Sequence, residues 1–315
     1  MGDAKKLDQF FTQDKIAVQC LRGSMKYIEM LDYDISKISF LEPSAGNGAF
    51  VKAAKKIGFR TYCYDIDPKH KYIKLADFLS ANLVNELPNR SNLITLGNPP
   101  FGKRSKLSIN FINRAFSYSD TVIFILPLQF MKYSAQSRID RNARLIYSER
   151  LKENSFIFEG SEYSVRCCLQ IWTLKEFNIN LRIIQSPQTK HSDFQMWQYN
   201  NTRAAEKYFD KKIYKWDFAV PRQGYKNYNL RVTNESELDK RTQWIFFKAN
   251  NSEVLDRLKK IDFTKLSKKN TSTPGFGKAD VIVEYDNLYN DRKKTFQLGE
   301  PKPNLALALD FSSSL

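Results

Sequence analysis

The stretch Ile38–Phe50 reads ISFLEPSAGNGAF and decides the fold of this chain. Its apolar start, Ile38–Leu41, is typical of a buried strand, and the following segment, Val51–Ile57, has the apolar spacing of a helix. Between them, Gly46 and Gly48 let the backbone approach a ligand closely, because glycine has no Cβ. The stretch predicts a strand, a ligand-binding loop and a helix, although an ordinary strand-to-helix turn also carries glycines.

Acidic residues mark the strand ends around this loop. Glu42 stands just before it, and Asp65 comes near the end of a second strand predicted over Phe59–Asp67. An acid at the end of the second strand of a βαβ unit is placed to hydrogen-bond ribose hydroxyls. The loop has an acid and fewer glycines than Gly-x-Gly-x-x-Gly, which suits a ligand without a pyrophosphate.

A third segment, Tyr72–Leu79, offers two more groups for a ligand. Asp77 can accept from an exocyclic amine, and Phe78 can flank a ring. The alternative for Asp77 is a helix cap.

A second informative stretch, Leu96–Gly102, reads LGNPPFG and follows an apolar run. Pro99 and Pro100 fix φ and carry no N–H, so the turn is rigid. If the Asn98 side-chain oxygen and the Pro99 carbonyl each accept an N–H of a planar amino group, its nitrogen becomes more nucleophilic and its developing charge is stabilised. Phe101 would then stack on the ring. The turn alone leaves an ordinary strand-to-loop connection open.

The rest of the first half alternates between helices and strands. Helices are predicted over 14–31 and 107–116, a buried strand over 121–127, and further strands near 156–158 and 165–172. This alternation predicts an α/β fold with a mostly parallel, helix-flanked sheet.

Arg138, Arg141 and Arg144 recur every three residues, which predicts guanidinium groups along one helical face. Such a face is either solvated or directed at phosphates.

The amino-acid composition indicates which class of partner the protein binds and which redox compartment it occupies. With 315 residues, of which 42% are hydrophobic, the chain is long enough for two domains, and its net charge of +16 indicates a polyanionic partner. The parts before and after residue 180 each carry +8, as expected if both bind one ligand. Four irregularly spaced cysteines indicate a reducing compartment, and two histidines without Cys-x-x-Cys argue against a metal site. No apolar run reaches about 18 residues, so neither a membrane span nor secretion is expected.

From about residue 180 the regular alternation fades, and basic residues and amides mix with aromatic residues. This change in residue pattern predicts a second, smaller domain. Arg and Gln side chains suit guanine and adenine edges, so Arg222 and Gln223, in a Pro-Arg-Gln-Gly context, are candidates for reading bases.

With the glycine loop, the two acids and the Asn-Pro-Pro-Phe turn in this order, the chain resembles the S-adenosylmethionine-dependent N6-adenine DNA methyltransferases of the restriction-modification or phage and viral type. The resemblance covers motifs spread over residues 9–172. It implies a Rossmann-like class I methyltransferase sheet, with a catalytic domain over 1–178 and a DNA target-recognition domain over 179–315. It also implies S-adenosylmethionine as cofactor and a cytoplasmic, nucleoid or host-cell location.

Site residues carry over motif by motif. The resemblance implies that the Asn-Pro-Pro-Phe turn is catalytic and that the cofactor is held by Phe11, Thr12, Glu42, Ser44, Ala45, Gly46, Gly48, Asp65, Ile66, Asp77 and Phe78. The family also holds the flipped base with an aromatic residue, for which Phe158 and Tyr163 both remain candidates. Lys103 and Arg104, directly after the turn, are expected to contact DNA.

The resemblance implies methyl transfer to the N6 of an adenine flipped out of double-stranded DNA. A separate cognate restriction endonuclease is an open partner, and no membrane partner is expected. Three alternatives remain: an RNA adenine N6-methyltransferase, a protein-glutamine N5-methyltransferase, and a nucleic-acid-binding protein with an inactive methyltransferase fold. A glutamine methyltransferase would need neither the +16 charge nor the basic C-terminal domain.

Overall fold

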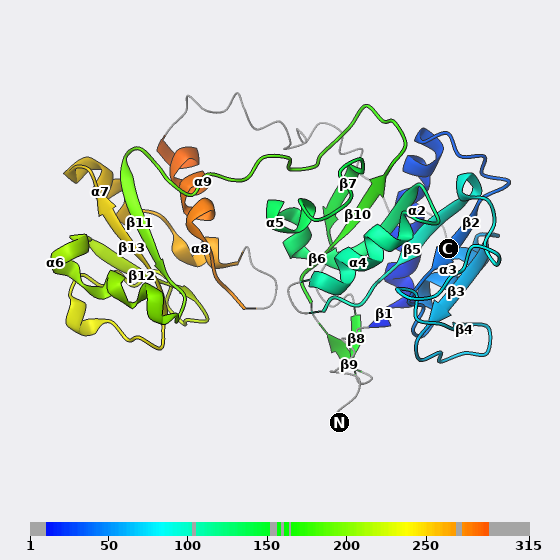
Figure 1. Cartoon of the computed structure of the whole chain (residues 1–315), viewed down its shortest axis with the longest axis horizontal. Helices are drawn as coiled ribbons and strands as arrows, with labels where there is room; N and C mark the ends of the chain where they lie inside the picture. Colours follow the sequence, from blue (N-terminus) through cyan, green and yellow to red (C-terminus); the bar gives the residue numbers. More distant parts are fainter. Residues whose placement is uncertain are drawn as a thin grey trace.

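The computed structural model describes residues 11–102, 105–151, 156–158, 161–163, 165–268 and 273–289, and of 157, 158 and 161–163 only the backbone. A seven-stranded sheet organises the first half of the chain (Figure 1). In spatial order its strands are β4 (Lys74–Leu75), β3 (Arg60–Asp65), β2 (Ser39–Glu42), β5 (Leu93–Gly97), β6 (Thr121–Pro127), β10 (Cys167–Thr173) and β7 (Arg144–Arg150).

The strand directions define the fold class. The neighbours from β4 to β6 pair in parallel, whereas β10 lies antiparallel between β6 and β7. All seven residues of β6 are buried, as expected for a central strand covered on both faces. The sheet confirms the predicted α/β class and is that of a Rossmann-like methyltransferase fold.

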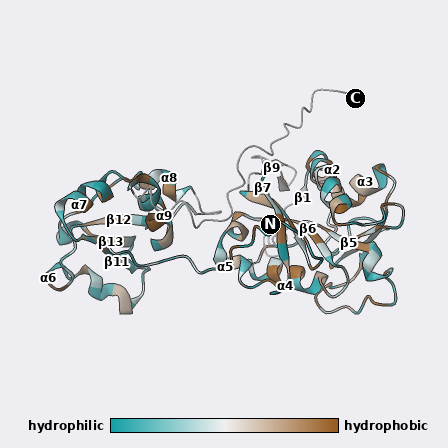
Figure 2. Cartoon of the chain, turned by 90° about the horizontal axis from the view of Figure 1, so that it is seen from above, coloured by the Kyte–Doolittle hydropathy of each residue, from teal (hydrophilic) through white to brown (hydrophobic). Residues whose placement is uncertain are grey.

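Helices cover both faces of this sheet, as Figure 2 shows. Helices α2 (Asp14–Met30) and α3 (Ala49–Lys56) pack on one face, and α4 (Lys106–Ala115) and α5 (Tyr133–Gln136) on the other. Three of these four helices match segments that the sequence predicts. Short 3-10 helices lie at Arg90–Asn92 and Leu128–Met131.

A small second sheet joins the start of the described chain to a distant hairpin. Strand β1 (Phe11–Thr12) pairs antiparallel with β8 (Phe156–Phe158), which pairs with β9 (Ser161–Tyr163). The residue pattern of the sequence does not predict this pairing, because strands β1 and β8 are more than 140 residues apart in the chain.

The predicted arginine-bearing helix over 138–144 is wrong. Helix α5 ends at Gln136, the chain turns at Asp140, whose carboxylate accepts the N–H of Asn142, and Arg144 begins strand β7. Pairing with β10 and burial of Leu145 override the three-residue spacing.

The C-terminal part is built on an antiparallel sheet of order β11-β13-β12. Its strands are β11 (Phe194–Tyr199), β12 (Phe218–Gln223) and β13 (Gln243–Ala249). One face carries the core beneath α7 (Ser252–Lys259), α8 (Phe263–Ser267) and α9 (Lys278–Tyr289), and the other packs against the 3-10 helix Arg203–Phe209 and α6 (Lys211–Tyr214). A further 3-10 turn spans Glu235–Glu237. No helix within the described ranges has the length and apolarity needed to cross a membrane.

Candidate functional site

The candidate site lies where the strand order reverses. Strands β3, β2 and β5 are parallel neighbours, so their carboxyl ends, at Asp65, Glu42 and Gly97, share one edge of the sheet. The chain leaves β2 toward β3 on one side and reaches β5 on the other. In open α/β sheets, ligands bind in the crevice at such a point.

The glycine loop after β2 is shaped by Asp65. Gly46 and Gly48 have positive φ values of 51° and 76°, which only glycine adopts easily. The Gly46 N–H donates to Asp65 Oδ2 at 2.7 Å, and the Asp67 N–H donates to Oδ1 at 2.8 Å. Each carboxylate oxygen has a second lone pair, so Asp65 can hold the loop and still accept from a ligand hydroxyl.

Glu42 is a buried acid that the protein only half satisfies. Its side chain is 4% exposed, and the Val51 N–H donates to its carboxylate, yet its Oε2 has no hydrogen-bond partner among the described residues. Burial, with the nearby charge of Asp65 adding to it, raises the pKa of Glu42 well above its usual range. A cationic group of a ligand would offset the free-energy cost of burying the charged Glu42 carboxylate.

The N-terminal strand closes over the glycine loop. A Cβ on Gly46 would lie 3.0 Å from the Phe11 ring, so the ring rests directly on the loop. Thr12 is buried, and its Oγ1 has no partner within the described part of the chain. Ala45 is buried and Ile66 is 53% exposed, which leaves Ile66 open to contact a ligand ring.

Asp77 and Phe78 are arranged differently from the other predicted ligand residues. The carboxylate of Asp77 accepts the Leu79 N–H and the Ser80 hydroxyl, both at 3.0 Å, so it caps a turn. Phe78 is buried in the core against Phe111, at 5.4 Å between ring centroids. Their contact with a cofactor stays a prediction.

The Asn-Pro-Pro-Phe turn follows β5 directly and touches the glycine loop. The Ser44 hydroxyl donates to the main-chain oxygen of Asn98 at 3.3 Å, and a Cβ on Gly97 would lie 3.4 Å from Glu42 Cγ. From the far side, the Ser108 hydroxyl of α4 donates to the Pro100 carbonyl at 3.1 Å. The turn is therefore fixed between the loop after β2 and helix α4.

Sequence reasoning missed Ser105, Ser108 and Gln129. The Ser105 hydroxyl donates to Gln129 Oε1 at 3.3 Å, and its N–H donates to the Gly102 carbonyl at 3.1 Å. No local pattern marks these contacts, because Gln129 and Ser105 come from different elements.

Two predicted DNA residues of the C-terminal part differ in their surroundings. The Arg222 guanidinium donates to the Phe276 carbonyl at 3.1 Å and to the side-chain oxygens of Asn200 and Gln243 at 2.8 and 2.6 Å. Burial lowers the pKa of Arg222, and its donors hold the sheet together. Gln223 is half-buried at the end of β12. Base reading by these two residues stays a prediction.

The remaining predicted DNA residues are not placed. Lys103 and Arg104 lie outside the described residues. Phe158 belongs to β8 and Tyr163 to β9; only the backbone of these two residues is described, so the choice between them remains open.

Two polar contacts join the C-terminal part to the carboxyl edge of the large sheet. Arg166 donates to the Lys268 carbonyl at 2.9 Å, and Lys132 forms a 3.6 Å ion pair with Asp280. Leu128, which begins the segment after β6, bonds through its N–H to the Arg166 carbonyl, so both contacts lie near that edge.

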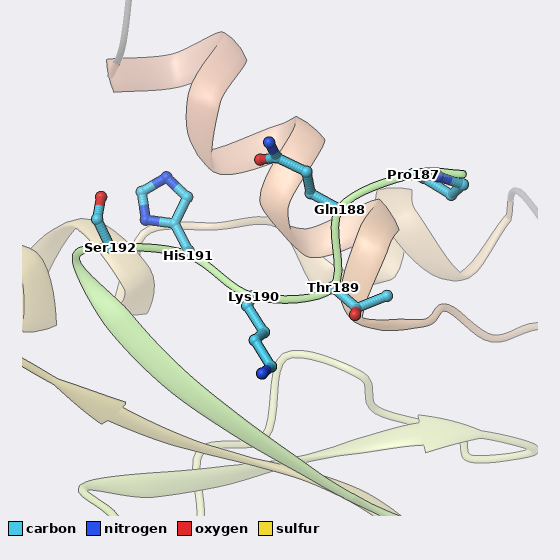
Figure 3. A pocket seen from close by; sticks show the side chains of 6 residues that line it. All are labelled: Pro187, Gln188, Thr189, Lys190, His191 and Ser192. Atoms are coloured by element: carbon cyan, nitrogen blue, oxygen red, sulfur yellow. The ribbon is translucent and has the colours of Figure 1, made fainter. Parts of the chain in front are cut away.

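A separate hollow of about 540 Å³ lies along the loop before β11, with Lys190 and His191 pointing to opposite sides of the loop (Figure 3). His191 anchors the loop to α9 through a 3.1 Å contact of its Nε2 with Asp286. The hollow is lined by Pro187, Gln188, Thr189, Lys190, His191 and Ser192, and therefore by none of the predicted site residues.

The sheet order and the loop at its carboxyl edge define a Rossmann-like domain of the methyltransferase kind. A family model described as the EDM2 methyltransferase-like domain matches residues 49–196. The match spans just under half of the chain, and over these residues the chain is similar to a methyltransferase-like domain.

Solved structures give further similarities. A Pyrococcus horikoshii protein assigned as an RNA methyltransferase is 16% identical, with a TM-score of 0.40 over 53% of this chain and 87% of that one. A DrdV–DNA complex is 13% identical, with a TM-score of 0.41 over 55% of this chain and 27% of that one. The M protein of the type I restriction enzyme EcoKI is 16% identical, with a TM-score of 0.35 over 46% and 41%. No curated protein sequence matches the chain.

Proposed function

We propose that this protein is a DNA adenine N6-methyltransferase that uses S-adenosylmethionine. The observation that carries the proposal is the contact between the glycine loop and the Asn-Pro-Pro-Phe turn through Ser44 and Asn98. This contact sets a turn rich in fixed acceptors beside a loop suited to a nucleoside ligand. The methyltransferase-like match over residues 49–196 supports the same reaction class.

The residues around the loop fit the cofactor. Asp65 would accept from the ribose hydroxyls, and Ile66 would contact the adenine ring. The unpartnered oxygens of Glu42 and Thr12 would bind the methionine end. When bound, S-adenosylmethionine supplies a methyl group that its sulfonium already makes electrophilic.

The turn would act on the amino group of the target base. Asn98 Oδ1 and the Pro99 carbonyl each accept one N–H, which localises the nitrogen lone pair and stabilises the positive charge that develops there. Phe101 stacks on the ring. Since positioning and lone-pair release carry the rate, the turn needs no general base.

The base must leave its stack to reach this turn, at a cost of a few kcal/mol. Stacking on Phe101 and phosphate contacts offset that cost. The charge of +16 and the C-terminal part joined beside the site support double-stranded DNA as the substrate. An RNA adenine methyltransferase is the second candidate, because the fold and the charge suit both nucleic acids.

The proposal is tested by transfer of a labelled methyl group to duplex DNA, single-stranded DNA, RNA and protein extract. We expect label in duplex DNA, recovered as N6-methyladenine after digestion. Label confined to RNA or to protein glutamine would overturn the proposal in favour of the corresponding alternative.

Binding to DNA should weaken steeply with salt. A protein that neutralises several phosphates releases counterions, so its affinity drops by roughly 10³-fold or more between 50 and 200 mM salt if about six phosphates are contacted. Fluorescence anisotropy with a labelled duplex measures this slope. An affinity that hardly changes with salt concentration would argue against a surface that binds several phosphates.

Glu42→Gln should weaken cofactor binding and stabilise the free protein at neutral pH. The folded state holds the Glu42 proton more tightly than the unfolded state, whose pKa is about 4.5, so in the wild type stability decreases as pH rises above that value. The variant lacks this titration, and its free energy of unfolding should decrease less with pH. It also loses a charged contact to the cofactor, which should weaken binding about 10-fold or more.

Urea unfolding between pH 5 and 8 and calorimetric titration of S-adenosylmethionine measure the two effects of Glu42→Gln. Glu237→Gln, the same chemical change at an exposed position far along the chain from the site residues, is the control. Unchanged cofactor affinity in Glu42→Gln would remove Glu42 from the cofactor site.

A further inference from the structure

The Asn98–Gly102 turn offers acceptors for an amino group, but its prolines remove two donors. Adenine also presents ring acceptors, N1 and N7, on the two sides of the carbon that bears the amino group. Recognition of adenine at this turn, which rests on the proposed function, therefore calls for a donor from a neighbouring element. The nearest element in the sheet is the segment after β6, because β6 pairs in parallel with β5.

Gln129 is held at that position. It belongs to the 3-10 helix Leu128–Met131, which follows β6 directly, and it is half-buried between the buried residues Leu128 and Phe130. Its Oε1 accepts the hydroxyl of Ser105, a residue only 4% exposed. The Ser105 N–H in turn donates to the Gly102 carbonyl at the end of the turn. Two hydrogen bonds thus connect the Gln129 amide to the catalytic turn.

This contact also orients the amide. With Oε1 directed at Ser105, the Nε2 donors face elsewhere, and Nε2 makes no hydrogen bond to any residue within the described ranges. The other donor-bearing side chain at the end of this segment, Lys132, forms an ion pair with Asp280. Gln129 is therefore the neutral donor that this segment presents.

We propose that Gln129 Nε2 donates a hydrogen bond to a ring nitrogen, N1 or N7, beside the amino group of the flipped adenine. The contact holds the base so that its amino group faces Asn98 and Pro99. At N1, the donor would also reject guanine, whose N1 carries a hydrogen. Gln129 is thus a base-holding residue in addition to the Asn-Pro-Pro-Phe turn.

The test combines enzyme variants with single-atom changes in the substrate. The methylated sequence is first mapped by single-molecule sequencing of DNA modified by the wild-type chain. Duplexes then carry adenine, 1-deazaadenine or 7-deazaadenine at the target position, and single-turnover rates are measured. The variant is Gln129→Glu, whose carboxylate has the shape of the amide but donates nothing at neutral pH. Gln195→Glu, in an exposed part of β11, is the control for the added charge on a DNA-binding protein.

For the wild type we expect one of the two deaza substrates to react about 5- to 30-fold more slowly than adenine, as one lost hydrogen bond predicts. With adenine, Gln129→Glu should react more slowly than the wild type by a similar factor. Replacing adenine with that same deaza analogue should slow Gln129→Glu only a little further. Gln195→Glu should keep the wild-type pattern. Cofactor affinity and thermal unfolding of Gln129→Glu should match the wild type, which separates lost base contact from misfolding.

Two results would overturn the inference: equal wild-type rates on all three duplexes, or an undiminished deaza effect in Gln129→Glu. A wild-type chain that transfers no methyl group to adenine in DNA would instead refute the proposed function, and the inference with it. If adenine in DNA is methylated but the effect of the deaza substitution is the same with and without the Gln129 amide, the proposed function stands and the inference alone is refuted.

Discussion

Asn98→Ala should reduce methyl transfer to DNA by about 10²-fold or more while S-adenosylmethionine still binds. The substitution removes an acceptor that engages the amino group most strongly as charge develops on it, and loss of one such preorganised contact typically costs 10²–10³-fold in rate. Cofactor binding should survive, because Asn98 meets the glycine loop through its main-chain oxygen, which alanine retains. Single-turnover transfer and calorimetric titration of the cofactor measure the two effects.

Two companion variants make the result specific. Asn98→Asp keeps an acceptor at the same position and should recover much of the rate. Asn110→Ala makes the same chemical change on an exposed position of helix α4 and should behave like the wild type. An Asn98→Ala enzyme with wild-type turnover would place the reacting amino group elsewhere.

The elements around the site could be predicted because each has a local cause. The strand before Glu42 is a continuous apolar run, and the loop after it needs glycine at two positive-φ positions. The prolines mark the turn after β5. These causes lie within a few residues of one another, so a single sequence displays them.

Contacts between distant segments could not be predicted in the same way. Strand β1 pairs with β8 across most of the first half of the chain, and strand β7 exists because its residues pair with β10. Arg144 shows the consequence: its spacing from Arg138 fits a helix, but pairing and burial in the sheet decide otherwise. A residue type also has more than one use: Phe78 packs against Phe111 in the core and Arg222 bonds to Gln243, so residue type alone does not decide whether either also contacts a ligand.

The same long-range contacts suggest how the site is kept in shape. Ser44 joins the glycine loop to the turn, Ser108 joins the turn to α4, and Ser105 joins the turn to Gln129. The hydroxyls of Ser44 and Ser108 and the N–H of Ser105 donate to carbonyls of a turn whose prolines already limit its motion. The shape of the Asn-Pro-Pro-Phe turn is therefore fixed by several loops at the edge of the sheet, and not by the residues of the turn alone.

Arg182→Ala should lower the free energy of unfolding by about 1–3 kcal/mol, because five carbonyls, three of them in partly buried contacts, would lose their donor at once. Arg182 Nη1 donates to the carbonyls of Asp140, Arg141 and Ala143, and Nη2 to those of Gln136 and Ile139, at 2.5 to 3.3 Å. The guanidinium thus holds both the turn that precedes β7 and the start of the segment that leads to the C-terminal sheet.

Arg182→Lys should recover only part of this loss, since a single ammonium has three donors and cannot span five carbonyls. Arg141→Ala, at an exposed position in the same turn, should change stability by no more than about 0.5 kcal/mol. Urea unfolding followed by tryptophan fluorescence measures all three variants. If Arg182→Ala were as stable as Arg141→Ala, the guanidinium would not be what anchors the turn before β7, and the connection to the C-terminal part would have to be held by Lys132 and Arg166 instead.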